Sequence, residues 1–199
     1  MIRPIKLAAI ALVAATSAGA QGIVAPSTQP TTGGRASQTM FQLGMVTPTG
    51  ELGDVGGVGG AINFVWQRTI PATQHTVGIR LDVPVAAGTA KENQDQGWTF
   101  ISPALGVVVS PVRSRLYVLP YAFASVAYSR VSFLDLLTSE EVSETGMGSA
   151  FGAGVELPTG MGRIALELRR VSAGLDGWTA SHTSLSLGFV SGGIRPPPR

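Results

Sequence analysis

The stretch TVGIRLDVPV, residues 76–85, carries an apolar side chain at every second position. Successive side chains of a β-strand point to opposite faces, so this pattern predicts a strand with one apolar and one polar face. In a soluble barrel the apolar face would point inward. In a membrane barrel it would face lipid, and Arg80 and Asp82 would be enclosed. The remainder of the chain decides between these two arrangements.

Similar alternating runs recur from residue 37 onward, each ended by Gly, Pro, Asn, Asp or Ser. Eight strands are predicted, over residues 37–46, 57–68, 74–86, 97–109, 115–130, 146–157, 162–171 and 178–190. Each matches or exceeds the roughly 9–11 residues with which a tilted strand crosses a bilayer, whereas strands of soluble proteins average about 5–6 residues. The pattern therefore predicts an all-β fold, an eight-stranded antiparallel up-and-down transmembrane β-barrel.

The connections between these strands are predicted to alternate in length. The longer ones are TPTGELGDVG, AGTAKENQDQ and VSFLDLLTSEEVSET, the shorter ones are TIPAT, SPVRS and PTGM, and the last is SAGLDG. Short periplasmic turns and longer outer loops are typical of outer-membrane barrels. An even number of strands then places both chain ends on the periplasmic side.

Charge follows the same division, although ordinary solvated loops are an alternative explanation. The longer connections hold nine of the twelve acidic residues, namely Glu51, Asp54, Glu92, Asp95, Asp135, Glu140, Glu141, Glu144 and Asp176. Arginines lie at or beside the short-turn end, at positions Arg68, Arg113, Arg115, Arg163, Arg195 and Arg199. The sequence therefore predicts one acidic and one basic end of the barrel.

Strand parity assigns the bulky apolar side chains to one face. The predicted lipid-facing positions are Phe41, Leu43, Met45, Ile62, Phe64, Trp66, Val77, Ile79, Leu81, Val83, Val85, Ile101, Leu105, Val107, Val109, Tyr117, Leu119, Tyr121, Phe123, Phe151, Val155, Leu157, Ile164, Leu166, Leu168, Leu185, Leu187 and Phe189. A soluble barrel would need a strongly charged exterior, yet only one lysine follows residue 20. The small and polar face therefore suits a narrow lumen better.

The opposite face predicts a polar network inside the barrel. Its members are Gln42, Asn63, Gln67, Arg80, Asp82, Glu156, Glu167 and Arg169, with Ser184 and Ser186 beside them. Buried charges are tolerated when they are paired and hydrogen-bonded, and two arginines among three carboxylates offer such pairing. Aromatic residues near the strand ends predict two interfacial girdles, made of Trp66, Trp98, Tyr117, Tyr128, Trp178 and Phe189.

The first twenty residues have the features of a secretory signal peptide. Arg3 and Lys6 precede the apolar run LAAIALVAA, and Ala18-Gly19-Ala20 provides a cleavage site. We therefore expect a signal peptide over 1–20, a flexible segment over 21–36, the barrel over 37–190 and a flexible tail over 191–199. Without Arg3 and Lys6 the chain holds 12 basic and 12 acidic residues, so nucleic acid is not an expected partner.

The signal peptide, the eight alternating strands and the closing run SLSLGF resemble the small outer-membrane β-barrel proteins of the OmpA/OmpX/OmpW-like superfamily. The resemblance covers about residues 37–190. It implies an outer-membrane location in a Gram-negative cell, with outer-membrane lipid, lipopolysaccharide and the barrel assembly machinery as partners. The chain departs from the family pattern by continuing past Phe189 as VSGGIRPPPR.

Candidate chemistry is sparse. His182 and Ser184 share one strand face, as a Ser–His pair would need, and SHTS resembles the His-x-Ser of the lipid A deacylases, but parity turns the pair toward the lumen. Glu140, Glu141 and Glu144 lack a calcium-loop pattern. We therefore expect a structural or surface-interaction protein without catalytic residues, metal or cofactor, whose surface-loop ligand the sequence does not identify. The alternatives are a narrow pore or hydrophobic-solute conduit, a lipid-modifying enzyme, and a soluble periplasmic binding barrel.

Overall fold

The computed structural model describes residues 37–73, 76–93, 95–110, 118–135, 137–159 and 162–192. The predicted signal peptide, the segment 21–36 and most of the predicted tail lie outside these ranges. The strands are β1 (Gln38–Gly50), β2 (Gly56–Thr69), β3 (Val77–Ala90), β4 (Gln96–Ile101), β5 (Ala104–Val109), β6 (Leu119–Asp135), β7 (Glu141–Thr159), β8 (Gly162–Gly174) and β9 (Thr179–Gly192). A short helix α2 (Glu51–Val55) and a 3₁₀ turn η2 (Pro71–Thr73) complete the described elements.

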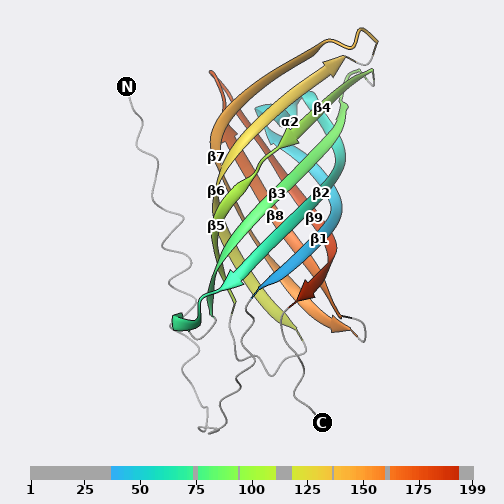
Figure 1. Cartoon of the computed structure of the whole chain (residues 1–199). Helices are drawn as coiled ribbons and strands as arrows, with labels where there is room; N and C mark the ends of the chain where they lie inside the picture. The colour runs from blue at the N-terminus through green and yellow to red at the C-terminus, as the bar shows by residue number, and fades with distance from the viewer. Residues whose placement is uncertain are drawn as a thin grey trace, which may run out of the picture. The chain divides into compact units, whose positions relative to one another are not determined.

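The strands form a closed antiparallel barrel, as predicted (Figure 1). Each strand pairs with its neighbours in the chain, and β1 also pairs with β9 along its whole length, from Gln38 opposite Gly192 to Gly50 opposite Ala180. This seam requires close backbone approach at Gly44, because a Cβ there would collide with the Leu185 carbonyl oxygen and Ser186 Cα. Closure leaves no sheet edge along the barrel wall, so the ladder itself satisfies the backbone hydrogen bonds of the strands.

The segments β4 and β5 are two halves of one strand, which gives the barrel eight strands. Both halves pair with β3 and with β6, and the register does not change across the break. The ladder is interrupted at Ser102 and Pro103, because proline has no N–H to donate. The Ser102 N–H and the Pro103 carbonyl still bond to β3 and β6, at 3.1 Å and 3.0 Å.

The predicted alternation of long and short loops is wrong. Most residues of the three long connections extend the strands instead: β1 continues to Gly50, β3 to Ala90 and β6 to Asp135, and β7 begins at Glu141. What remains there is α2 and the short connections 91–95, 136–140 and 175–178. Continuing the ladder satisfies backbone groups that a loop would leave to water. No helix in the described part of the chain is long and apolar enough to cross a bilayer.

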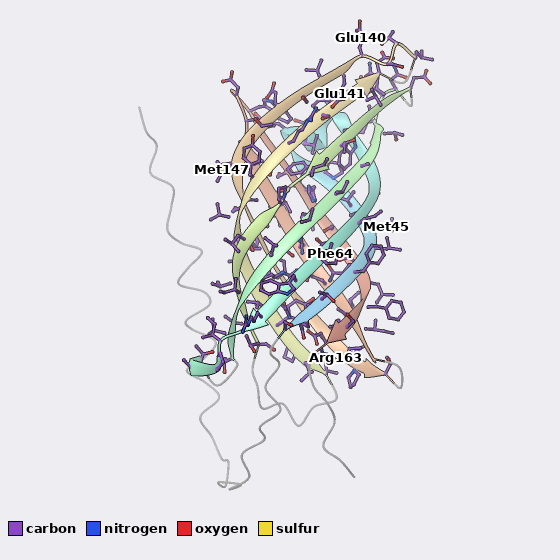
Figure 2. All side chains as sticks on the ribbon, viewed as in Figure 1. Met45, Phe64, Glu140, Glu141, Met147 and Arg163 are labelled. Atoms are coloured by element: carbon purple, nitrogen blue, oxygen red, sulfur yellow. The ribbon has the colours of Figure 1, made fainter. Side chains whose placement is uncertain are left out.

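The outer wall carries an apolar belt, in which Met45 and Phe64 point away from the barrel (Figure 2). Leu43, Leu105 and Leu187 are more than half exposed, at 54%, 59% and 57%. The predicted facing of β6 is wrong: Tyr121 and Phe123 are 4% and 5% exposed and lie in the lumen, while Val126 and Tyr128 face outward. The alternation in β6 changes phase at Phe123, and the strand takes the phase in which two aromatic rings contact the lumen charges.

Candidate functional site

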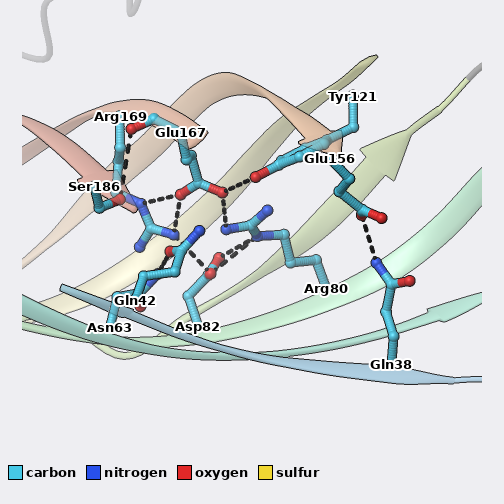
Figure 3. A network of polar contacts seen from close by, with 10 residues as sticks. All are labelled: Gln38, Gln42, Asn63, Arg80, Asp82, Tyr121, Glu156, Glu167, Arg169 and Ser186. Atoms are coloured by element: carbon cyan, nitrogen blue, oxygen red, sulfur yellow. Dashed lines mark hydrogen bonds and ion pairs between the residues drawn. The ribbon is translucent and has the colours of Figure 1, made fainter. Parts of the chain in front are cut away.

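Four charged side chains form a closed network in the middle of the lumen (Figure 3). Arg80 on β3 donates from Nε to both Asp82 oxygens, at 2.9 Å and 3.1 Å, and from Nη2 to Glu167 Oε2 at 2.8 Å. Arg169 on β8 donates from Nη2 to Asp82 Oδ1 at 2.9 Å and to Glu167 Oε1 at 2.8 Å. Each guanidinium thus bridges both carboxylates, so the network joins opposite walls of the barrel. All four side chains are at most 2% exposed.

Two aromatic residues of β6 complete this network. The Tyr121 hydroxyl donates to Glu167 Oε2 at 2.8 Å. The Phe123 ring lies 3.8 Å from Arg80 Cζ and 5.0 Å from Arg169 Cζ, within the range of a cation–π interaction. A buried arginine therefore meets both a carboxylate and a π-face, which offsets the cost of removing its charge from water.

A second network closes the end of the lumen where β1 begins and β9 ends. Arg163 donates to Glu156 Oε2 at 2.7 Å, to Gln38 Oε1 at 3.0 Å and to the Gly192 carbonyl at 2.8 Å. Gln38 in turn donates to Glu156 Oε1 at 2.9 Å. One arginine therefore connects β7, β8 and both strands of the seam. Across the two networks three arginines face three carboxylates, so the lumen charges of the described residues balance.

The half of the lumen nearer α2 is apolar. Its buried cluster consists of Val46, Leu52, Ala86, Trp98, Phe100, Ala104, Ala127, Val131, Ala150, Val171, Ala173 and Ala180. Leu52 points inward from α2 and is fully buried, and Trp98 is held by a 3.2 Å hydrogen bond from its Nε1 to the Gly57 carbonyl. The Phe100 ring meets His182 edge-on, with 4.7 Å between ring centroids. Two large aromatic rings and a leucine thus fill this half of the barrel.

The end of the barrel that carries α2 is acidic, and several of its acids hold the connections together. Glu51 accepts a hydrogen bond from the Thr179 N–H, Glu144 accepts from Trp178 Nε1 at 2.7 Å, and Glu141 pairs with Arg130 at 3.0 Å. The Thr138 and Leu137 amides donate to the Asp135 carboxylate, which lowers its pKa. The remaining acids of this end are exposed: Asp54, Glu92, Asp95, Glu140 and Asp176.

The structure places all eight residues of the predicted polar network inside the barrel, each at most 5% exposed. It joins Arg80, Asp82, Glu167 and Arg169 directly, and Asn63 Nδ2 donates to Gln42 Oε1 at 2.6 Å. Glu156 belongs to the second network instead, and Gln67 is buried apart. Sequence analysis missed Gln38, Tyr121 and Arg163 as lumen residues. Parity gave the signal for two of them, because Gln38 alternates with Gln42 and Arg163 with Glu167.

The predicted aromatic girdles survive only in part. Trp98 is 1% exposed and fills the lumen, so its assignment to a girdle was wrong. It shares the parity of Phe100, and that alternation already turned it inward. Trp178 is half-buried and packs against the lumen cluster. Tyr128 and Phe189 are exposed at 53% and 71%, Trp66 is half-buried, and Tyr117 lies outside the described residues.

The candidate Ser–His pair lies inside the barrel. His182 and Ser184 are 1% and 6% exposed, and His182 Nδ1 has no hydrogen-bond partner among the described residues. No described hydrogen bond joins the two side chains, so the geometry of an activated serine is not present there. Within the described ranges, no three His, Cys, Asp or Glu side chains group closely enough to hold a metal ion.

Comparison with known proteins shows the fold. Neither a protein-family model nor a curated protein sequence matches the chain. Among solved structures, the chain is similar to Neisserial surface protein A, with a TM-score of 0.63 and 13% identity over 79% of this chain and 97% of that one. It is also similar to a major outer membrane protein from Thermus thermophilus, with a TM-score of 0.52 and 14% identity over 78% of this chain and 100% of that one. The chain therefore has the fold of the small eight-stranded outer-membrane barrels.

Proposed function

We propose that this chain is an integral outer-membrane protein with a structural or surface-interaction role and a lumen filled by side chains. The observation that carries the proposal is the distribution of polarity across the barrel wall. Leu, Ile, Val, Phe and Met side chains are exposed around its circumference, while six ionised side chains are enclosed and paired. Water would penalise such an exterior, whereas the acyl chains of a bilayer match it.

The filled lumen supports an interaction role over the alternative of a narrow pore. Leu52, Trp98 and Phe100 occupy one half of the barrel, and the Arg80–Glu167 and Arg169–Asp82 ion pairs cross the other. We expect the protein in planar bilayers to give no conductance above the lipid baseline. Steady ohmic channels that disappear after removal of the protein would favour the pore.

Membrane insertion is tested by fractionation together with gel mobility. The protein is expected in the detergent-extracted fraction of the outer membrane, and an unboiled sample is expected to migrate differently from a boiled one because a folded barrel resists detergent denaturation. A pool that is extracted without detergent and shows no heat-dependent mobility would contradict the proposal and favour a soluble periplasmic barrel.

Orientation is tested at the acidic end. We propose that α2 and the connections 91–95, 136–140 and 175–178 face the exterior of the cell, with the chain ends in the periplasm. An epitope inserted after Ser139, in the exposed turn between β6 and β7, is expected to bind antibody on intact cells. An epitope at the chain's C-terminus is expected to bind only after permeabilisation, and the reverse result would invert the orientation.

Recognition by the barrel assembly machinery is proposed for β9, whose alternating residues Leu185, Leu187 and Phe189 face outward. Phe189 pairs across the seam with Phe41, which faces the same surface and serves as a matched control. We expect Phe189→Ala to reduce assembly in cells more than Phe41→Ala, with similar refolding of both variants into vesicles. Equal effects in cells would argue against β9 as the recognition strand.

A further inference from the structure

The outer wall carries one polar region, over β7, β8, β9 and β1. We call it the hydroxyl field, and it consists of Thr47, Thr49, Ser149, Ser172, Ser181 and Thr183. These residues are cross-strand neighbours: Ser149 pairs with Ser172, Ser172 with Ser181, Ser181 with Thr49, and Thr183 with Thr47. The Thr49 and Ser181 hydroxyls are hydrogen-bonded at 2.9 Å. On β3, by contrast, the outward positions Ile79, Leu81, Val83 and Val85 are all apolar.

Arg170 stands at the border between this field and the apolar belt. It is exposed on β8, and its cross-strand neighbours are Thr183 on one side and Phe151 on the other. Two positions further along β8 toward the opposite end of the barrel, Leu168 pairs with Leu185, and both are more than half exposed. The guanidinium therefore originates within the belt, on its hydroxyl-bearing side.

The charge of Arg170 has no carboxylate partner among the described residues. Arg130, the other arginine on the outer wall at this end, is paired with Glu141 at 3.0 Å, and the three lumen arginines are all in ion pairs. Both cross-strand neighbours of Arg170 are uncharged. An arginine on the lipid face of a barrel is destabilising at depth and is tolerated near the interface. This position therefore favours a compensating anion supplied by the surroundings.

The available donors fit a phosphate. A guanidinium offers two parallel N–H donors that match two phosphate oxygens, and serine and threonine hydroxyls donate to the remaining oxygens. The exposed Phe151, Leu168 and Leu185 adjoin these donors and match an acyl chain. We infer that Arg170, with Thr183 and Thr47, binds the phosphate of a membrane lipid in the leaflet at the α2 end, its acyl chain lying on those apolar residues. This inference rests on the proposed membrane location.

The test is native mass spectrometry of the full chain in detergent micelles, with phosphatidic acid as the probe, a phosphate monoester on two acyl chains. Arg170→Gln is expected to weaken binding by at least about tenfold, since hydrogen bonds to a charged group are lost. Thr183→Val is expected to weaken it less, and Arg170→Lys to restore it only in part. Arg130→Gln, which removes an arginine already paired within the chain, is the matched control and is expected to leave binding unchanged.

Further arms separate the sources of error. Phosphatidylglycerol, a phosphodiester, is expected to bind more weakly at the same site, and inorganic phosphate and diacylglycerol not measurably. Equal binding of inorganic phosphate would indicate an anion site without lipid specificity and overturn the inference, as would a dimer of the chain lost in Arg170→Gln. A heat-modifiable Arg170→Gln barrel that binds phosphatidic acid like the wild type overturns the lipid site alone. A wild-type chain that fails to insert into vesicles overturns the membrane location as well.

Discussion

Replacing Glu167 by glutamine tests whether the enclosed ions stabilise the barrel. Glu167 accepts four hydrogen bonds from three side chains: Arg80 Nη2, Tyr121 Oη, and Nε and Nη2 of Arg169, at distances between 2.8 Å and 3.1 Å. Glutamine keeps the shape but removes the charge and turns an amide NH₂ toward donors. Two arginines would then share Asp82 alone.

The magnitude follows from burial. Removing one partner of a buried ion pair costs about 3–5 kcal/mol, because an uncompensated charge remains in a medium of low dielectric constant. The matched control is Glu141→Gln, which breaks the ion pair with Arg130 at the rim, where both side chains are about half exposed. Solvent screens that pair, so its loss is expected to cost about 0–1 kcal/mol.

The assay is urea unfolding of the chain refolded in phospholipid vesicles, followed by tryptophan fluorescence and by the mobility of unboiled samples on gels. The double variant Glu167→Gln, Arg169→Gln restores charge balance and leaves the Arg80–Asp82 pair, so its cost is expected to be smaller than the sum of the two single variants. If Glu167→Gln destabilises the barrel no more than Glu141→Gln, the lumen screens its charges as water does, and the reasoning is refuted.

Three further predictions concern packing and facing. Gly44→Val is expected to prevent closure of the seam, because its Cβ would strike the backbone of β9, whereas Gly60→Ala, with no neighbour nearer than 4.0 Å, should still give a heat-modifiable barrel; equal folding of both would contradict the seam geometry. In vesicles of brominated lipid, Trp66→Phe is expected to abolish more of the fluorescence quenching than Trp98→Phe, since Trp98 is enclosed; the opposite result would return Trp98 to the lipid face. Trp98→Ala is expected to destabilise the barrel by about 3–5 kcal/mol, measured by urea unfolding, and a cost below about 1 kcal/mol would mean that the apolar half of the lumen is not packed.

The period of two determined most of the architecture. In β3, β8 and β9, each outward residue carries a large apolar side chain and each inward residue a polar or small one, so parity alone placed Arg80, Asp82, Glu167 and Arg169 in the lumen. The limit of this reasoning is β6, where bulky residues occupy odd positions up to Phe123 and even positions from Val126. A strand has a single parity, so one half of it must point its large residues inward, and the local sequence does not say which half.

The sequence by itself determined the eight strands, their antiparallel order and the separation of charge from the apolar wall, because strand periodicity and turn chemistry are local properties of the chain. Only the tertiary structure decided the facing of Tyr121 and Phe123, the enclosure of Trp98 and the continuation of the strands through the predicted loops. Each of these depends on partners distant in sequence: Glu167 and Arg80 for the β6 rings, the Gly57 carbonyl for Trp98, and a neighbouring strand with free hydrogen-bonding groups for each extended hairpin. The free energy of these contacts arises only when the barrel closes.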